Sequence, residues 1–137
     1  VQGILLPIER KPPAVSLRKL NILIVEDHEN TATVMSKLLK RNGHEVMTAS
    51  TVRQALDVLR TTSLDLLVSD LGLPDGNGFE VMTELSKVSD AKGIAISGYG
   101  MDEDVERSSR AGFSAHLTKP IDVQKLQETI LQVTAAA

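Results

Sequence analysis

Residues 64–78 have the sequence LDLLVSDLGLPDGNG, and this stretch decides the fold. Its first six residues form a mostly apolar run, which is typical of a strand buried on both faces of a parallel sheet. Asp70 follows directly, so a carboxylate is expected at the carboxyl end of that strand. Residues 71–78 then contain three glycines, a proline, an aspartate and an asparagine, a composition typical of a tight turn.

The same pattern, a short apolar run followed by a helical repeat, occurs along the rest of the chain. Four further strands are expected at 22–25, 44–49, 94–97 and 114–118. Helices are expected at 30–42, from Thr51, from Phe79, around 102–110 and from Asp122. Five strand–helix units with short connections predict an α/β fold, in which helices cover both faces of one parallel sheet.

Each helical repeat places apolar side chains on one face, which is expected to pack on the sheet. The spacing of Thr51 and Gln54 predicts a capping box at the start of one helix, and Gly43 is expected just beyond the end of another. The inward-facing side chains are expected to be Val34, Met35, Leu38, Leu39, Val52, Ala55, Leu56, Leu59, Phe79, Met82, Leu85, Val88, Val123, Leu126, Ile130 and Val133.

Composition and charge exclude several classes of function. Apolar residues make up 42% of the chain and charged residues 24%, as in globular proteins, and no run approaches the roughly 20 apolar residues of a membrane helix. The absence of cysteine excludes disulfides and thiolate metal sites. The net charge is −3, with +3 in the first 20 residues and −6 in the remainder. An acidic body with three aromatic residues argues against nucleic-acid binding by this domain.

Residues 1–19 are expected to form a linker or an arm from a preceding domain. They contain three of the five prolines and show neither helical nor strand periodicity. The folded domain is therefore expected to comprise residues 20–137.

Three carboxylates follow two strands that are neighbours in a doubly wound sheet. Glu26 and Asp27 come after the strand at 22–25, and Asp70 comes after the strand at 64–69. Like charges that converge raise each other's pKa unless a cation joins them. Oxygen ligands without Cys or His suit Mg²⁺, which also retains waters and a substrate phosphate. The alternative is that these carboxylates only cap helices, since acidic side chains are favoured at helix N-termini.

Two further strand ends carry groups that suit phosphoryl transfer. Ser97 closes the strand at 94–97, and Lys119 stands directly before Pro120. The proline disfavours a helical conformation at Lys119, and a cis Lys119–Pro120 bond would aim the ammonium over the sheet edge. A metal and an ammonium can balance the charge on the equatorial phosphoryl oxygens, while a hydroxyl bonds one of them and a carboxylate acts as nucleophile. The alternative for Lys119 is an ordinary surface position.

With these residues in place, the chain resembles the receiver domain of two-component response regulators over about residues 20–134. An acidic pair, a central aspartate before an L-x-L-P-x-x-x-G motif, a serine and a Lys-Pro pair carry the resemblance. The matching segments are ILIVEDHEN, LDLLVSDLGLPDGNGFEVM, IAISGYG and AGFSAHLTKPIDVQKL. The fold it implies is flavodoxin-like, a (βα)5 doubly wound five-stranded parallel sheet with strand order 2-1-3-4-5.

The resemblance implies a phosphoacceptor and a metal site. Asp70 is the expected phosphoacceptor, with a phosphohistidine as donor. Glu26, Asp27 and Asp70 are the expected side chains around Mg²⁺ (or Mn²⁺), with Asp27 a direct ligand and Glu26 acting partly through water. The backbone carbonyl of Gly72 is the expected further ligand. Receivers of this type also catalyse their own dephosphorylation, so the domain is expected to be a phosphotransfer module rather than a turnover enzyme.

The resemblance also implies a switch. Ser97 matches the switch hydroxyl, and Lys119 matches the lysine that pairs with Asp70 or its phosphate. Three residues before Lys119, where the family usually has Tyr or Phe, this chain has His116. A histidine can make the same inward swing, and the alternative is a partly exposed strand residue without a switching role. Tyr99 is expected over the mouth of the pocket, with packing against the fourth helix as its alternative.

His28 directly follows the acidic pair and invites assignment as a metal ligand. An imidazole is a poor ligand for Mg²⁺, so a solvent-facing or pocket-rim position is expected instead.

The expected partners are a histidine kinase or a histidine phosphotransfer domain, with no membrane or nucleic-acid contact by this domain. A monomer or weak dimer is expected. The parent chain is expected to be a hybrid sensor histidine kinase with this receiver at its C-terminal end, and a stand-alone regulator is the rival. The expected location is cytoplasmic, with a tether if the parent kinase is membrane-bound. The alternative function is a phosphorylation-independent pseudo-receiver, an interaction module on the same fold.

Overall fold

A computed structural model describes residues 19–98 and 102–135, with the backbone alone at 102–104. Tyr99 and residues 1–18 lie outside this part of the chain, so the expectations for them stay predictions. Within the described ranges, no helix has both the length and the apolar character needed to cross a membrane.

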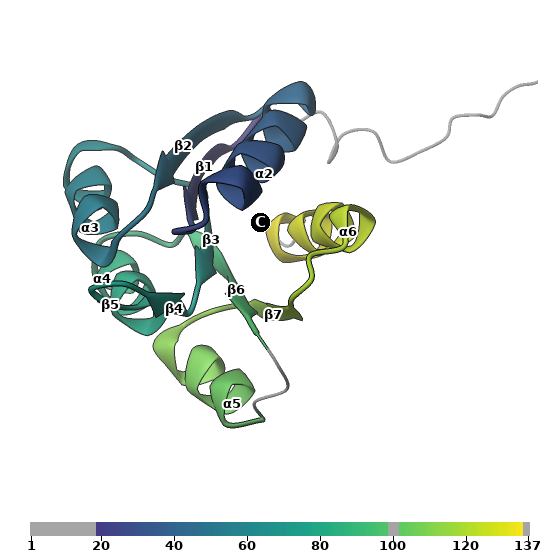
Figure 1. Cartoon of the computed structure of the whole chain (residues 1–137). Helices are drawn as coiled ribbons and strands as arrows, with labels where there is room; N and C mark the ends of the chain where they lie inside the picture. The colour runs from purple at the N-terminus through teal and green to yellow at the C-terminus, as the bar shows by residue number, and fades with distance from the viewer. Residues whose placement is uncertain (1–18, 99–101, 136–137) are drawn as a thin grey trace, which may run out of the picture.

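Five parallel strands form one sheet in the order β2-β1-β3-β6-β7 (Figure 1). The three central strands, β1, β3 and β6, are buried along nearly their whole length, as expected for strands covered on both faces. The strands are β1 Asn21–Val25, β2 Glu45–Ala49, β3 Leu66–Asp70, β6 Lys92–Ser97 and β7 Ala115–Thr118. Because β4 and β5 belong to a separate hairpin, this order is the predicted 2-1-3-4-5, and the flavodoxin-like fold is confirmed.

Helices cover both faces of the sheet, and each face has its own apolar core (Figure 1). Successive strand residues point to opposite faces, so Leu23 and Leu67 enter one core while Ile24 and Val68 enter the other. The first core packs against α3, α4 and α5, and the second against α2 and α6. The helices are α2 Glu29–Arg41, α3 Val52–Thr61, α4 Gly78–Val88, α5 Asp102–Ala111 and α6 Val123–Thr134.

The helix ends follow the capping signals in the sequence. The Thr51 hydroxyl caps α3 by accepting a hydrogen bond from the N–H of Gln54 at 3.1 Å. The Gln54 side chain bonds Ser50 instead of Thr51, so only half of the predicted capping box forms. Asp122 caps α6 with its side chain. Gly43 follows α2 with a φ of +97°, a left-handed conformation that glycine adopts without steric cost.

Three valines that were predicted to face the core are exposed. Val34, Val88 and Val123 have exposed fractions of 58%, 71% and 42%. Val88 is the last residue of α4 and Val123 is the first of α6, so both lie at a helix end rather than over the middle of the packed face. Val34 lies beside the buried Met35 and, with Val123, lines a surface groove.

The segment after β3 is more ordered than the predicted turn. Gly72–Leu73 (β4) and Gly76–Asn77 (β5) form a short antiparallel hairpin. At its tip, the Asp75 carboxylate accepts hydrogen bonds from the N–H groups of Val52 and Arg53 at 2.8 and 3.1 Å. These two bonds hold the pKa of Asp75 below its ordinary value. The hairpin therefore caps the start of α3 from a distant part of the chain.

Candidate functional site

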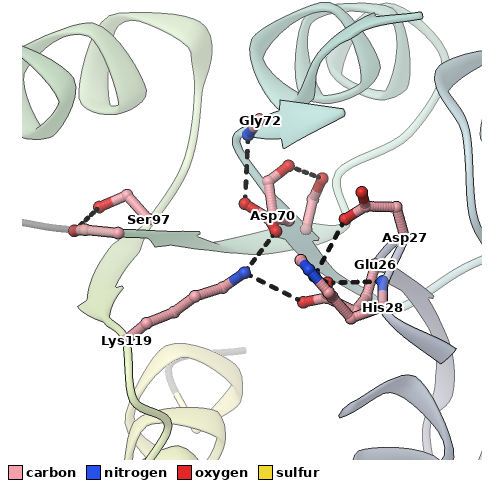
Figure 2. A network of polar contacts seen from close by, with 9 residues as sticks. Glu26, Asp27, His28, Asp70, Gly72, Ser97 and Lys119 are labelled. Atoms are coloured by element: carbon pink, nitrogen blue, oxygen red, sulfur yellow. Dashed lines mark hydrogen bonds and ion pairs between the residues drawn. The ribbon is translucent and has the colours of Figure 1, made fainter. Parts of the chain in front are cut away.

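Charged side chains from three strands meet at the carboxyl edge of the sheet (Figure 2). Glu26 follows β1, Asp70 ends β3 and Lys119 follows β7. Glu26 and Asp70 are almost completely buried, with exposed fractions of 2% and 6%. The topology thus brings together residues that lie up to 93 positions apart in the sequence, from 26 to 119.

Lys119 is the cation of this cluster. Its Nζ donates a hydrogen bond to Asp70 Oδ2 at 2.7 Å and lies 3.5 Å from Glu26 Oε1. Burial by itself would lower the pKa of Lys119, but the hydrogen bond and charge of Asp70, together with Glu26, raise that pKa above 10.5. The side chain is therefore an ammonium at neutral pH. The peptide bond between Lys119 and Pro120 is cis.

Glu26 is buried with too few hydrogen-bond donors around it. Its Oε2 accepts a bond from the N–H of His28 at 3.0 Å and lies 3.0 Å from Nδ1 of the same residue. Its Oε1 is buried and makes no hydrogen bond within the described part of the chain. The Lys119 ammonium, 3.5 Å away, is an ion-pair partner of this oxygen but does not hydrogen-bond it. A buried carboxylate oxygen without a hydrogen bond is costly, and a further cation at this point would stabilise it.

The carboxylates around Glu26 form a set that fits a metal ion. Ligand atoms of Glu26, Asp27, His28 and Asp70 all lie within 4.8 Å of one another. Carboxylate oxygens are ligands that Mg²⁺ prefers, whereas an imidazole is a poor one. The His28 side chain is 70% exposed, in agreement with the predicted position at the rim. The donor set therefore fits a hard divalent cation held by oxygen atoms.

The start of α4 fixes the backbone beside Asp70. The N–H of Gly78 donates to the carbonyl of Leu71 at 3.0 Å, and a Cβ atom at position 78 would lie 2.5 Å from the Asp70 carbonyl oxygen. Only glycine allows this close approach. The Asp70 carboxylate accepts a bond from the N–H of Gly72 at Oδ1 and from Lys119 at Oδ2, so both of its oxygens are held. The role of the Gly72 carbonyl as a metal ligand stays a prediction.

Ser97 is buried at the end of β6, but its hydroxyl points away from Asp70 (Figure 2). Its Oγ lies 2.7 Å from His116 Nε2 and 3.3 Å from the carbonyl oxygen of Gly98. His116 is half-buried on β7. Ser97, the expected switch hydroxyl, is thus joined directly to His116, for which a switching role and a partly exposed strand position were the two alternatives. Tyr99, the other residue expected near the pocket mouth, falls in the undescribed segment.

Two features of the site were missed from the sequence. Gly78 received no role, although a third glycine directly before an apolar helix was a usable signal of a close backbone approach. The contact between His28 and Glu26 was also not predicted. A spacing of two residues is compatible with many side-chain directions, so it gave no signal for this bond.

The family model of the response regulator receiver domain matches residues 22–131. The chain belongs to this family. Receiver domains are signalling domains of two-component systems, in which they interact with kinases or phosphotransfer partners. The matched range includes all four charged residues discussed above, Glu26, Asp27, Asp70 and Lys119.

Known relatives of this receiver domain include single-domain and multidomain proteins. The polar-differentiation response regulator DivK of Brucella ovis is 32% identical over 113 residues, which cover 80% of this chain and 92% of DivK. The sensory/regulatory protein RpfC of Xanthomonas campestris is 28% identical over 126 residues, covering 88% of this chain but 17% of RpfC. A CheY-like receiver domain from Methanospirillum hungatei has a TM-score of 0.82 at 28% identity, with 87% of this chain and 96% of that chain covered.

Proposed function

We propose that this receiver domain accepts a phosphoryl group from a phosphohistidine onto Asp70, in a reaction that depends on Mg²⁺ (or Mn²⁺). One observation carries the proposal: the buried Asp70 carboxylate lies 2.7 Å from the Lys119 ammonium and beside Glu26, whose Oε1 lacks a hydrogen bond within the described residues. A carboxylate with an ammonium on one side and metal ligands on the other is suited to receive a phosphoryl group.

The transfer exchanges one bond of phosphorus for another. The P–N bond of the donor phosphohistidine breaks while a P–O bond forms to a carboxylate oxygen of Asp70, and the imidazole nitrogen retains the electron pair. The transferred group spreads its negative charge over three equatorial oxygens. Lys119 bonds Asp70 before the reaction and would bond one of these oxygens afterwards. Its raised pKa keeps it charged at neutral pH, so no proton is lost as it changes partner.

Glu26, Asp27 and Asp70 would hold the divalent cation, with the Gly72 carbonyl as a further ligand. When bound, the cation supplies positive charge to the phosphoryl oxygens. Without it, three carboxylates face one ammonium, and the excess of negative charge would repel an incoming phosphoryl group. The buried Glu26 Oε1 and the oxygen ligands around it support this assignment.

The phosphoryl donor would be a histidine kinase or a histidine phosphotransfer domain. Membership of the receiver family supports this partner class, since these domains act within two-component systems. The match to RpfC covers only 17% of that protein, which supports a receiver that forms part of a larger sensor protein. After transfer, the Ser97 hydroxyl would donate a hydrogen bond to a phosphoryl oxygen, and the domain would change conformation. Water would later hydrolyse the aspartyl phosphate, so the domain would lose its phosphoryl group without acting as a turnover enzyme.

Incubation of the purified domain with acetyl phosphate and Mg²⁺, followed by intact mass measurement, tests the proposal. We expect a gain of one phosphoryl group that EDTA prevents and that Asp70→Asn abolishes. Asp57→Asn, at an exposed position of α3, is the matched control and should be labelled like the wild type. Absence of labelling, or labelling that persists in Asp70→Asn, would contradict the proposal and favour a pseudo-receiver.

A further inference from the structure

The hairpin of β4 and β5, which follows Asp70, is attached to the starts of two helices (Figure 1). The Asp75 carboxylate at its tip accepts hydrogen bonds at 2.8 and 3.1 Å from the N–H groups of Val52 and Arg53, the first two residues of α3. On the other arm, Asn77 caps α4. The hairpin therefore joins the beginning of α3 to the beginning of α4.

A close packing contact accompanies the bonds of Asp75. A Cβ atom at Gly76 would lie 3.2 Å from Cγ2 of Val52 and 2.5 Å from Oε1 of Glu80, so the second arm of the hairpin lies directly against both helices. Leu73, on the first arm, packs against the apolar core that contains Val52. The bonds of Asp75 thus hold a segment that is already seated on α3.

The first arm of the hairpin carries Gly72, whose backbone carbonyl is a proposed metal ligand. Gly72 is exposed, and a Cβ atom at this position would have no neighbour within 4 Å. Its N–H donates to Asp70 Oδ1 at 3.1 Å, and it is opposite Asn77 in the hairpin (Figure 2). No side chain packs to fix this residue, so its backbone bonds determine where its carbonyl lies. The position of that carbonyl therefore depends on how firmly the hairpin is attached.

We propose that Asp75 is a positioning residue for the metal site: by attaching the hairpin to α3, it keeps the Gly72 carbonyl beside Asp70, where that carbonyl can bind the cation. This inference rests on the proposed function, which assigns a divalent cation to this site. A ligand that is held in place beforehand loses less conformational freedom on binding, so the affinity is higher. Because such coupling is reciprocal, occupancy of the metal site strengthens the bonds between Asp75 and α3.

The first experiment measures the dissociation constant of Mg²⁺ by isothermal titration calorimetry. We expect Asp75→Ala to raise it about fivefold, at the lower end of the usual coupling between two sites. Asp75→Asn, whose amide oxygen can still accept a hydrogen bond, should lie between Asp75→Ala and the wild type. Thr51→Ala is the matched control, because it removes the 3.1 Å bond to the N–H of Gln54 that caps α3 but leaves the hairpin attached. It should lower the thermal midpoint of unfolding, as Asp75→Ala does, and bind Mg²⁺ like the wild type.

The second experiment tests the reciprocal effect at α3. The rates at which the Val52 and Arg53 amide protons exchange with water are measured by NMR without Mg²⁺ and with a saturating concentration. We expect Mg²⁺ to slow both rates about fivefold in the wild type and to leave them unchanged in Asp75→Ala. The Gln124 amide, which the Asp122 carboxylate caps at the start of α6, is the internal control and should exchange at the same rate with and without Mg²⁺. Rates at Val52 and Arg53 that do not respond to Mg²⁺ would overturn the inference.

The outcomes separate this inference from the proposed function. If Asp27→Asn abolishes Mg²⁺ binding while Asp75→Ala leaves the dissociation constant unchanged, the proposed site stands and the inference alone falls. Equal weakening by Asp75→Ala and Thr51→Ala would also overturn the inference, since a loosened α3 and not the hairpin would be the cause. If the wild type does not bind Mg²⁺, the metal-dependent function and the inference both fall.

Discussion

At the level of single residues, the site holds more negative than positive charge. Asp70 and Glu26 both lie within ion-pair distance of Lys119, and Asp27 lies 3.4 Å from the His28 ring. Close carboxylates repel one another, so the folded state carries an electrostatic cost at this edge of the sheet. Any cation that binds the folded site and not the unfolded chain removes part of that cost and stabilises the fold.

We therefore expect Mg²⁺ to raise the thermal midpoint of unfolding. At a concentration about 100-fold above its dissociation constant, a ligand of the folded state adds about 2.7 kcal/mol of stability. Asp27→Asn removes the negative charge of an exposed proposed ligand and should abolish most of this gain, whereas Asp57→Asn, at an exposed position of α3, should retain it. Scanning calorimetry at constant ionic strength measures both. An equal gain in Asp27→Asn would place the cation elsewhere.

His44 gives the fold a second dependence on solution conditions. Its Nδ1 accepts a hydrogen bond from the N–H of Leu20 at 3.1 Å, which only an unprotonated Nδ1 can do. Partial burial holds the pKa of His44 below 6.5. Because the pKa is lower in the folded state, the contribution of this residue is fully present above about pH 6.5 and is lost as the pH falls through the folded-state pKa.

We expect the difference in unfolding free energy between the wild type and His44→Ala to decrease on acidification. At about pH 7.5 the difference should be about 1 kcal/mol, the net contribution of one hydrogen bond, and at about pH 5 it should be smaller. Urea unfolding of the two proteins at both pH values provides the measurement. Taking the difference cancels the titration of the carboxylates that both proteins share. A difference that stays constant over this range would exclude the hydrogen bond as its source.

The sequence was sufficient to predict which charges meet, but not how each side chain bonds. Glu26, Asp70 and Lys119 each lie at the carboxyl end of a predicted strand, and the carboxyl ends of parallel strands meet at one edge of the sheet, so their convergence follows from the order of the strands. The direction of the Ser97 hydroxyl depends on a rotamer and on a cross-strand register. The spacing of residues in the sequence determines neither of these. The bond between Ser97 and His116 could therefore be found only from the structure.

Among the secondary-structure elements, the start of α4 has the closest relation to the site. Asn77 and Glu80 form a full capping box there, with both reciprocal hydrogen bonds at 3.1 Å. The helix begins so close to β3 that a Cβ atom at Gly78 would lie 2.5 Å from the Asp70 carbonyl oxygen and 2.8 Å from Ser69 Oγ. Any side chain at this position must therefore move either the helix or the backbone of Asp70, the proposed phosphoacceptor.

Gly78→Ala should accordingly destabilise the domain by about 1–3 kcal/mol, the usual cost of overpacking. It should also slow labelling by acetyl phosphate, because Asp70 shifts. Gly72→Ala is the matched control, since a Cβ atom at that position has no neighbour within 4 Å, and its stability should change by less than about 0.5 kcal/mol. Urea unfolding and the rate of mass gain check both parts. Equal stability of the two variants would show that α4 can move away from β3 without a loss of unfolding free energy.

The ends of the helices and strands were predictable to within a few residues. Which of their side chains are buried was less predictable. The period of the helical repeat identified the face that contains Met35, but it also included Val34, which the structure exposes. A repeat gives the direction of a side chain around the helix axis and not the width of the surface that covers it. The Asp75 cap on α3 joins residues 22 and 23 positions apart, so no local pattern could indicate it.

For the molecule as a whole, the exposed valines of α2 and α6 form part of an apolar surface that lies beside the site. Val34 and Val123 line a groove that also includes Ile121 and borders His28 and Lys119. Lys119, which lines the groove, also bonds Asp70, so a protein that delivers a phosphoryl group to Asp70, as proposed, would cover the groove. An exposed apolar surface next to the proposed phosphoacceptor favours contact with a protein donor over a small phosphorylated molecule.

We expect Val34→Asp and Val123→Asp to slow phosphoryl transfer from a protein donor by about tenfold or more, which corresponds to about 1.4 kcal/mol of lost contact. Labelling by acetyl phosphate should be unchanged, because the variants leave the carboxylates and Lys119 in place. A phosphorylated histidine kinase selected from a panel for transfer to the wild-type domain serves as the donor. Val88→Asp, which is 71% exposed on α4 at the other face of the sheet, is the matched control. Equal slowing with both donors would mean that the valines support the site itself and not the donor, whereas slowing with the kinase alone assigns the groove to the incoming phosphohistidine protein.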